Sequence, residues 1–271
     1  MSTIAATAPS RRVGVTQARV ILSEWTKLRS VRSTRWSLFA ATLLTIGFPI
    51  LAASVISAHW GHRSPAERAH FNALDPALVG AQIAQLAIGV LGVLAITAEY
   101  STGMIRASFT AVPKRLPVLW GKAVVFAAVT FVLMLPAVLI AFFASQSILA
   151  RHHVNLTFSD PHVARAVIGA ALYLTVIALF SLGIGSIVRN TAGGIATFAA
   201  ILFVVPPLMN VLPASWNNAI SPYLPNNAGT AILAIHPDVN RLAPWTGFGV
   251  FCAYTAGTLA VAAILLVRRD T

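Results

Sequence analysis

The sequence predicts an all-α polytopic membrane protein, and three observations lead to this fold class. Hydrophobic residues make up 57% of the 271 residues, and the mean hydropathy is +0.79. Charged residues make up only 10%, whereas soluble domains average about 25%. Six stretches are long and apolar enough to cross a hydrocarbon core of about 30 Å. These observations exclude a soluble enzyme, a disordered chain and a nucleic-acid-binding module.

The predicted spans contain no Asp, Glu, Lys, Arg or His, and we expect them to form one transmembrane domain over residues 1–271. They cover residues 36–58, 78–98, 123–144, 166–188, 192–212 and 245–267. The third span is the most uniformly apolar, with Thr130 as its only polar residue. The fifth span is the weakest, because Pro206 and Pro207 remove backbone donors and predict a bend.

The basic residues predict how the chain is oriented in the membrane. Fourteen of the nineteen Lys and Arg residues precede the first span, follow the fourth and sixth spans, or lie between the second and third. Because positive residues accumulate on the cytoplasmic side, we expect both termini to be cytoplasmic in a multi-pass protein of the cell membrane. The net charge of +12 then reflects topology and attraction to anionic lipid, not a nucleic-acid partner.

Residues 1–35 are expected to form a cytoplasmic tail and an interfacial amphipathic helix. Apolar residues recur there at helical spacing, at Ala18, Ile21, Leu22, Trp25, Leu28 and Val31. Charged residues lie largely off this stripe, at Arg19, Glu24, Lys27 and Arg29. Such a helix is predicted to lie in the plane of the interface with its basic face near the headgroups. It is either a topological anchor or a lever that moves the first span.

The loop over residues 99–122 is the most informative segment for function. Glu99 stands where the second span leaves the hydrocarbon, so we expect its charge to stay hydrated, with Arg106 as a candidate partner. Gly103 permits a sharp change of direction. The loop is therefore predicted to begin with a turn whose geometry an ion pair could hold.

A short amphipathic helix is predicted inside the same loop. Ile105, Phe109 and Val112 share one face, and Pro113 discourages the helix from continuing. An apolar helical face at the membrane surface is suited to docking into a groove of a soluble partner. An ordinary basic loop is the alternative interpretation.

The loop motif is Glu-Tyr-x-x-Gly-x-Ile-Arg, followed by Pro-x-Arg. It resembles the motif after the second span of permease subunits in the ABC-2 type exporter family of ABC transporters. Met104 departs from that motif, where Thr is common. The order of elements is also similar, and Ser221-Pro222-Tyr223-Leu224-Pro225 looks like a segment common in actinobacterial members. The resemblance assigns ATPase coupling to Glu99, Tyr100, Gly103, Arg106, Phe109, Pro113 and Arg115.

The resemblance also implies partners and a mechanism. Two permeases, as a homodimer or a related pair, would face each other in the lipid bilayer and export a hydrophobic or amphipathic substrate. Each coupling helix, here residues 103–113, would sit in a cleft of a separate ABC ATPase subunit, which binds ATP and Mg. This chain is then no enzyme by itself and needs no cofactor of its own. Consistent with that, the sequence contains no Gly-x-x-x-x-Gly-Lys-Ser/Thr phosphate-binding motif.

Three polar residues are candidates for the substrate path. Gln82 and Gln85 stand one helical turn apart near the outer end of the second span, and Asn210 follows the prolines of the fifth. Hydrogen bonding to neighbouring helices is the alternative role for the two glutamines. Ser181, Gly183, Gly185 and Ser186 are instead predicted to allow close helix packing. The seven histidines lie outside the spans and are interpreted as solvated loop residues, so no metal site is predicted.

The longest outer segment, residues 213–244, contains five prolines and several large apolar residues. We expect it to form a short helix or re-entrant turn packed at the outer interface. Other functions were weighed against the permease. An ion-coupled carrier or a membrane-embedded enzyme would require ionisable groups inside the membrane, which the spans lack. An uncoupled secondary carrier and a non-transporting structural or immunity subunit remain as alternatives.

Overall fold

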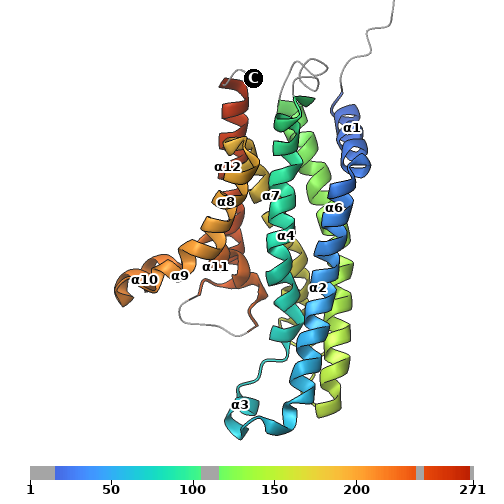
Figure 1. Cartoon of the computed structure of the whole chain (residues 1–271). Coiled ribbons are helices and arrows are strands. Elements are labelled where there is room, and N and C mark those ends of the chain that lie inside the picture. Colours follow the sequence, from blue (N-terminus) through green and yellow to red (C-terminus); the bar gives the residue numbers. More distant parts are fainter. Residues whose placement is uncertain (1–15, 105–115, 236–240, 269–271) are drawn as a thin grey trace, which may run out of the picture.

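The computed structural model describes residues 16–104, 116–235 and 241–268 (Figure 1). These residues contain no strand, and six of their helical segments are long and apolar enough to cross a membrane. The chain is therefore an all-α, multi-pass membrane protein, as its sequence predicts.

Five of the six spans in the described part of the chain are single helices. They are α2 (Arg32–Ala58), α4 (Leu74–Ser101), α6 (Leu116–Leu149), α7 (Val163–Val188) and α12 (Pro244–Arg268). Each contains the predicted apolar stretch, and α6 extends furthest beyond it. A helix of 34 residues is about 51 Å long, which exceeds a hydrocarbon core of about 30 Å. The length of the apolar stretch does not predict these extensions, because backbone hydrogen bonds continue a helix into polar surroundings.

The fifth span is interrupted, as its prolines predict. It consists of α8 (Thr191–Ala199), a π-helical turn labelled η3 (Ala200–Val204) and α9 (Val205–Met209). The π turn immediately precedes Pro206 and Pro207, which have no N–H to donate. The chain turns away from the bundle here and continues into α10 (Ala214–Ile220) (Figure 1). We call α9 and α10 the arm.

Short elements connect the spans at one end of the bundle and along its side. Three of them follow α2 and α6: η1 (Trp60–His62), α3 (Pro65–Ala69) and η2 (Ala150–His152). Three more follow the arm: η4 (Ser221–Tyr223), α11 (Pro225–Thr230) and η5 (Ala231–Leu233). In this second group Ile232 is buried against Gly169 of α7, and Ala231 against Gly247 of α12. The later part of residues 213–244, which holds α11 and η5, therefore packs against the bundle, whereas α10 belongs to the arm.

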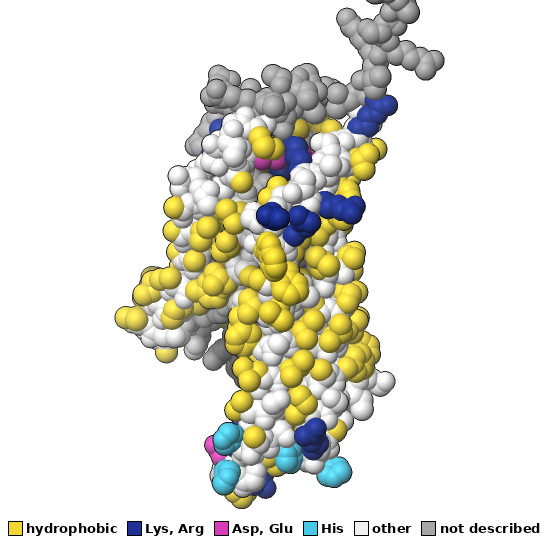
Figure 2. Space-filling model, turned by 45° about the vertical axis from the view of Figure 1, so that its right-hand side comes forward, with side chains coloured by type: hydrophobic (Ala, Val, Ile, Leu, Met, Phe, Trp, Pro, Cys, Tyr) yellow, Lys and Arg dark blue, Asp and Glu magenta, His cyan; other side chains and the backbone are white. Residues whose placement is uncertain are grey.

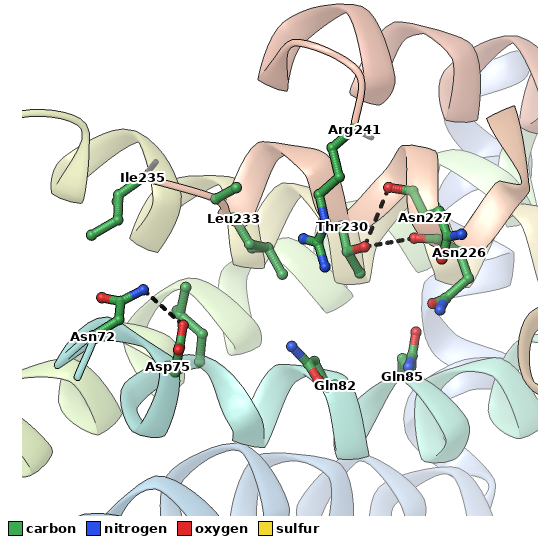
Figure 3. A pocket seen from close by; sticks show the side chains of 12 residues that line it. Asn72, Asp75, Gln82, Gln85, Asn226, Asn227, Thr230, Leu233, Ile235 and Arg241 are labelled. Carbon is green, nitrogen blue, oxygen red and sulfur yellow. Dashed lines mark hydrogen bonds between the residues drawn. The ribbon is translucent and has the colours of Figure 1, made fainter. Parts of the chain in front are cut away.

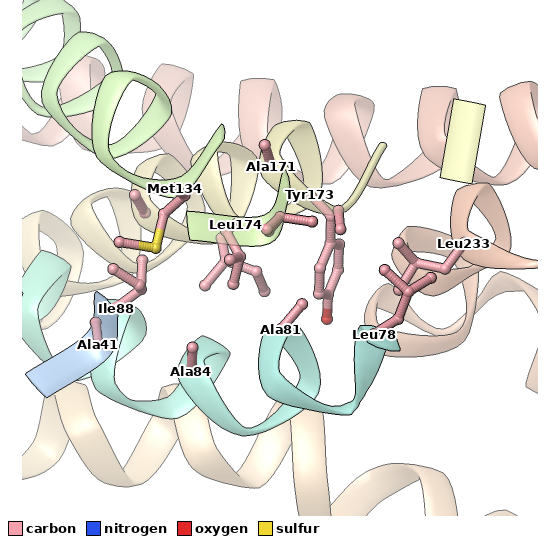
Figure 4. Packing of buried hydrophobic residues seen from close by; sticks show 14 of the residues in the cluster. Ala41, Leu78, Ala81, Ala84, Ile88, Met134, Ala171, Tyr173, Leu174 and Leu233 are labelled. Carbon is pink, nitrogen blue, oxygen red and sulfur yellow. The ribbon is translucent and has the colours of Figure 1, made fainter. Parts of the chain in front are cut away.

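Helix α7 lies at the centre and packs against α4, α6, α8 and α12. Small residues make the close approaches, as predicted for this helix: Gly185 lies against Val93 of α4, and Gly183 against Thr258 of α12. Opposite Ser181 is Gly92 of α4, where a Cβ would lie 2.0 Å from the serine Oγ. Larger side chains fill the remaining core between α4, α6 and α7 (Figure 4), among them Ile88, Met134, Tyr173 and Leu174.

Charged side chains distinguish the two ends of the bundle. Lys and Arg residues gather at the end that holds the N-terminal helix α1 (Gln17–Ser30) and the end of α12, whereas the described histidines lie at the opposite end (Figure 2). We call these the basic end and the histidine end. The surface between them is largely apolar, as expected for a protein surrounded by lipid.

Candidate functional site

The N-terminal helix α1 (Gln17–Ser30) docks against the start of α6. Gln17 Nε2 donates a hydrogen bond of 3.1 Å to the carbonyl of Pro117. One turn further, the buried Val20 lies over Gly121, where a Cβ would be 3.0 Å from Val20 Cγ1. Helix α1 therefore packs along the first turns of α6 (Figure 1).

Four charged side chains meet where α1, α4 and α6 converge. Lys122 Nζ on α6 lies 2.7 Å from Glu24 Oε2 on α1 and 2.8 Å from Glu99 Oε1 on α4. Lys27 Nζ lies 2.6 Å from Glu24 Oε1 and 3.4 Å from Glu99 Oε1. Glu24, Glu99 and Lys122 are 3%, 6% and 7% exposed. We call these four residues the charge network.

The charge network fastens three helices together. Its two carboxylates and two ammonium groups balance formally, which compensates the desolvation of each ion, a cost of several kcal/mol. One expectation was wrong, because the Glu99 side chain is buried among other charged groups and is not exposed to solvent. Both carboxylates can be buried because Lys122, on another helix, forms an ion pair with each of them. In the described part of the chain, both ion-pair partners of Glu99 are lysines.

Tyr100 and Gly103 continue this region at the end of α4. The half-buried Tyr100 ring lies 5.2 Å from the guanidinium carbon of Arg189, a cation–π contact. Arg189 also donates a hydrogen bond of 3.0 Å to the carbonyl of Leu265 on α12, so α4, α7 and α12 are connected. Gly103 has a φ of +72°, and this left-handed conformation provides the predicted turn.

The remaining predicted coupling residues, Arg106, Phe109, Pro113 and Arg115, lie outside the described residues. The charge network nevertheless stands at both borders of this segment. Glu99 comes before it on α4, and Lys122 follows it on α6, each within about two helical turns. A force on residues 105–115 would therefore reach the charge network through two helices at once.

A polar cavity of about 520 Å³ opens towards the histidine end, between α4 and the segment of α11 and η5. Gln82 and Gln85 line it from α4 and point towards Arg241 and Asn226 on the facing side (Figure 3). Asp75 adds a carboxylate, and it accepts a hydrogen bond of 2.9 Å from Asn72 Nδ2. Amide groups with one cation and one anion can bind the polar part of an uncharged or zwitterionic molecule.

The two glutamines differ in their surroundings. Gln85 is 4% exposed, and its Oε1 accepts a hydrogen bond from the fully buried Tyr173 hydroxyl of α7. That hydroxyl also lies 3.1 Å from Asn226 Oδ1. Gln85 thus forms a hydrogen bond to a neighbouring helix and also lines the cavity, while Gln82 is exposed to the cavity. Asn210 does not join them: it lies at the end of α9 and accepts a hydrogen bond of 3.4 Å from Asn217.

Sequence reasoning missed several residues of these two sites. From the sequence, Lys122 and Arg241 are only two basic residues between predicted spans, with no structural role predicted for either. Asn226 and Asp75 were not considered. One signal was available for the charge network: Glu24 and Glu99 are acidic residues at the borders of apolar stretches in a chain with only seven acidic residues.

No family model matches the chain, and no curated protein matches it either. Among residues 16–104, 116–235 and 241–268, no three His, Cys, Asp or Glu side chains are grouped to hold a metal ion. The functional argument therefore depends on the charge network, the polar cavity and the loop between α4 and α6.

Proposed function

We propose that this chain is the membrane-spanning permease subunit of an ABC transporter of the ABC-2 type. In this proposal it pairs with a second permease, binds a separate ATPase subunit and exports its substrate across the cell membrane. Both termini and the basic end would then face the cytoplasm, where the ATPase binds. The excess of Lys and Arg on that side supports this orientation.

The single observation that carries the proposal is the charge network. It joins the three elements that a coupling loop would have to move: α1, the end of α4 and the start of α6. Removing one partner of a buried ion pair typically costs 3–5 kcal/mol, so the three helices resist separation. A push on the loop from a nucleotide-driven partner would therefore displace them as one body.

The polar cavity supplies a place for the substrate in this proposal. It lies on the same helix, α4, that ends in the charge network, so a movement of α4 would reach both regions. Its amides would bind the polar part of an amphipathic substrate, and the apolar helix surfaces would accept the rest. This is consistent with a hydrophobic or amphipathic passenger.

Docking of the ATPase can be tested by affinity purification from solubilised membranes, with this chain as bait. The native chain should recover a soluble ATPase. Phe109→Asp should lose it, because the substitution places a charge on the predicted apolar docking face. Phe109→Leu is the matched control and should retain the ATPase. If the native chain recovers no ATPase after cross-linking, the permease assignment fails and the uncoupled carrier becomes the better explanation.

Coupling can be tested separately in proteoliposomes that contain the purified complex. Glu99→Ala and Arg106→Ala should insert normally in the membrane but hydrolyse ATP without the substrate-dependent change of rate that the native complex shows. ATPase activity with and without a panel of amphipathic substrates is the measurement. Native coupling in both variants would contradict the assigned role of the loop.

A further inference from the structure

Helix α1 turns its apolar stripe away from the bundle. The residues it buries are Val20 and the charged Glu24. By contrast, Leu22 is 64% exposed and Trp25 is 43% exposed. The side of α1 that packs on protein is therefore the one that carries the charge network, and the apolar side remains available to another partner.

Beneath that stripe lies an apolar groove of about 760 Å³ between α1, α2 and α6. Leu22, Trp25 and Leu28 form one wall, and Val132 and Leu133 of α6 form the opposite side. The volume lies within the range of roughly 300–1,000 Å³ that is typical of ligand pockets. Its lining is aliphatic and aromatic, apart from two arginines, so its contents must be apolar for most of their length.

The two arginines, Arg29 of α1 and Arg35 of α2, belong to the same groove. Both are exposed, and among the described residues neither guanidinium forms a hydrogen bond or an ion pair. Lys27 of the charge network, by contrast, forms ion pairs with Glu24 and Glu99. The groove therefore combines an apolar lining with two cations whose charge is not neutralised within the described chain.

We propose that this groove binds an anionic phospholipid, with one acyl chain against α1 and α6 and the headgroup phosphate at Arg29 and Arg35. The charges decide the lipid class, because the cationic group of a zwitterionic headgroup would offset the attraction of its phosphate. The bound lipid would hold the outer side of α1 while the charge network holds its inner side. This site goes beyond the proposed function and does not depend on it.

The charge requirement can be tested by native mass spectrometry of the purified full-length chain with added lipid. Palmitoyl-oleoyl phosphatidylglycerol should bind more tightly than palmitoyl-oleoyl phosphatidylcholine. Arg29→Gln and Arg35→Gln should each weaken phosphatidylglycerol binding about fivefold, and the double variant roughly 30-fold. Arg32→Gln removes a neighbouring exposed arginine that does not line the groove, and it should leave the affinity unchanged.

The position of the acyl chain needs its own test. Ala128 is exposed within the groove, so Ala128→Trp should displace the lipid by filling the space. Ala260→Trp adds the same bulk to an exposed position of α12 and should have no effect on binding. Phosphatidylglycerol with a photoreactive acyl chain should label α1 and α6 peptides of the native chain and of Ala260→Trp, but not of Ala128→Trp.

Three outcomes would overturn the proposal. Equal affinity for the two lipids would remove the charge requirement. An equal loss of phosphatidylglycerol affinity in Arg32→Gln would mean that the affinity depends on the general surface charge and not on the two arginines of the groove. Unchanged labelling in Ala128→Trp would place the lipid outside the groove. The arginine variants change exposed side chains, so they test the proposal even if Ala128→Trp does not fold.

Discussion

The two ends of α4 differ in the surroundings of their polar side chains. At the basic end, Glu99 is buried in a set of ion pairs that joins α1 and α6 to α4. Towards the histidine end, Gln82 and Gln85 face an open cavity lined mainly by amides, with one carboxylate (Asp75) and one guanidinium (Arg241). Buried ion pairs make a joint that resists separation, whereas amides around a cavity leave room for a ligand. One helix thus connects a rigid attachment to a ligand-sized space.

The largest effect is expected from breaking the rigid attachment. Lys122→Ala leaves two buried carboxylates with one ion-pair partner in the described chain, Lys27. The substitution should therefore lower the free energy of unfolding by about 3–5 kcal/mol. Titration with a denaturing detergent in bicelles measures this change. Arg32→Ala, which removes an exposed cation at the same end, should change it by less than about 0.5 kcal/mol. A similar change in unfolding free energy for both variants would show that the charge network is not the rigid attachment described above.

A smaller loss is expected midway along α4. Gly92→Ala would place its Cβ 2.0 Å from Ser181 Oγ and 2.7 Å from the Ala178 carbonyl, which forces α4 and α7 apart. Overpacking of this kind costs about 1–3 kcal/mol. Gly249→Ala is the control, because no atom lies within 4 Å of its Cβ and alanine favours a helix. The same detergent titration should show opposite signs for the two variants.

The cavity end should respond less to the loss of a polar group. Tyr173→Phe leaves the buried Gln85 Oε1 without the hydroxyl donor, a change of about 1 kcal/mol in unfolding free energy. Tyr254→Phe removes an exposed hydroxyl from α12 and should have no measurable effect. A loss as large as that of Lys122→Ala would mean that the cavity wall is as rigid as the charge network.

The smallest expected effect is a local dependence on pH at the histidine end. Ser64 donates its backbone N–H to Glu67 Oε2 at 2.7 Å and accepts from the Glu67 N–H, which caps α3. These hydrogen bonds lower the pKa of Glu67 below the ordinary value of 4.5. Capping by the carboxylate is complete above that value and is lost as the pH falls through the lowered pKa.

Hydrogen exchange of the α3 amides across this pH range is the measurement for Glu67. Exchange should become faster, relative to the intrinsic rate, as the carboxylate is protonated. Glu67→Gln should remove the pH dependence, because an amide does not titrate there. A pH dependence that persists in this variant would assign the effect to another group.

The sequence predicts the spans well because length and hydropathy decide which segments cross a membrane. It also predicts the bend at Pro206 and the turn at Gly103, since both follow from backbone chemistry at a single residue. The face of α1 that packs inward could not be predicted this way. An apolar stripe is equally suited to protein and to lipid, so periodicity alone does not tell which one covers it.

The same limit applies to the candidate sites. Gln82 and Gln85 are recognisable because amides are rare within an apolar span, but Asn226 of α11 and Arg241 lie more than 140 residues away. The charge network likewise unites Glu24 and Lys122 from distant segments, so its members resemble ordinary interfacial charges until the helices are placed. Contacts between distant segments depend on helix rotation and tilt, which hydropathy does not encode.

The π turn over Ala200–Val204 determines where the arm points. A π turn holds one residue more than an α turn, so it rotates everything beyond it by about 100° relative to α8. Deleting one residue from this stretch would restore regular α-helical winding and carry Trp216, which is 63% exposed, to a different side of the span. Related chains that differ by a single insertion here would present different lipid- or protein-facing surfaces while every other span stayed in register.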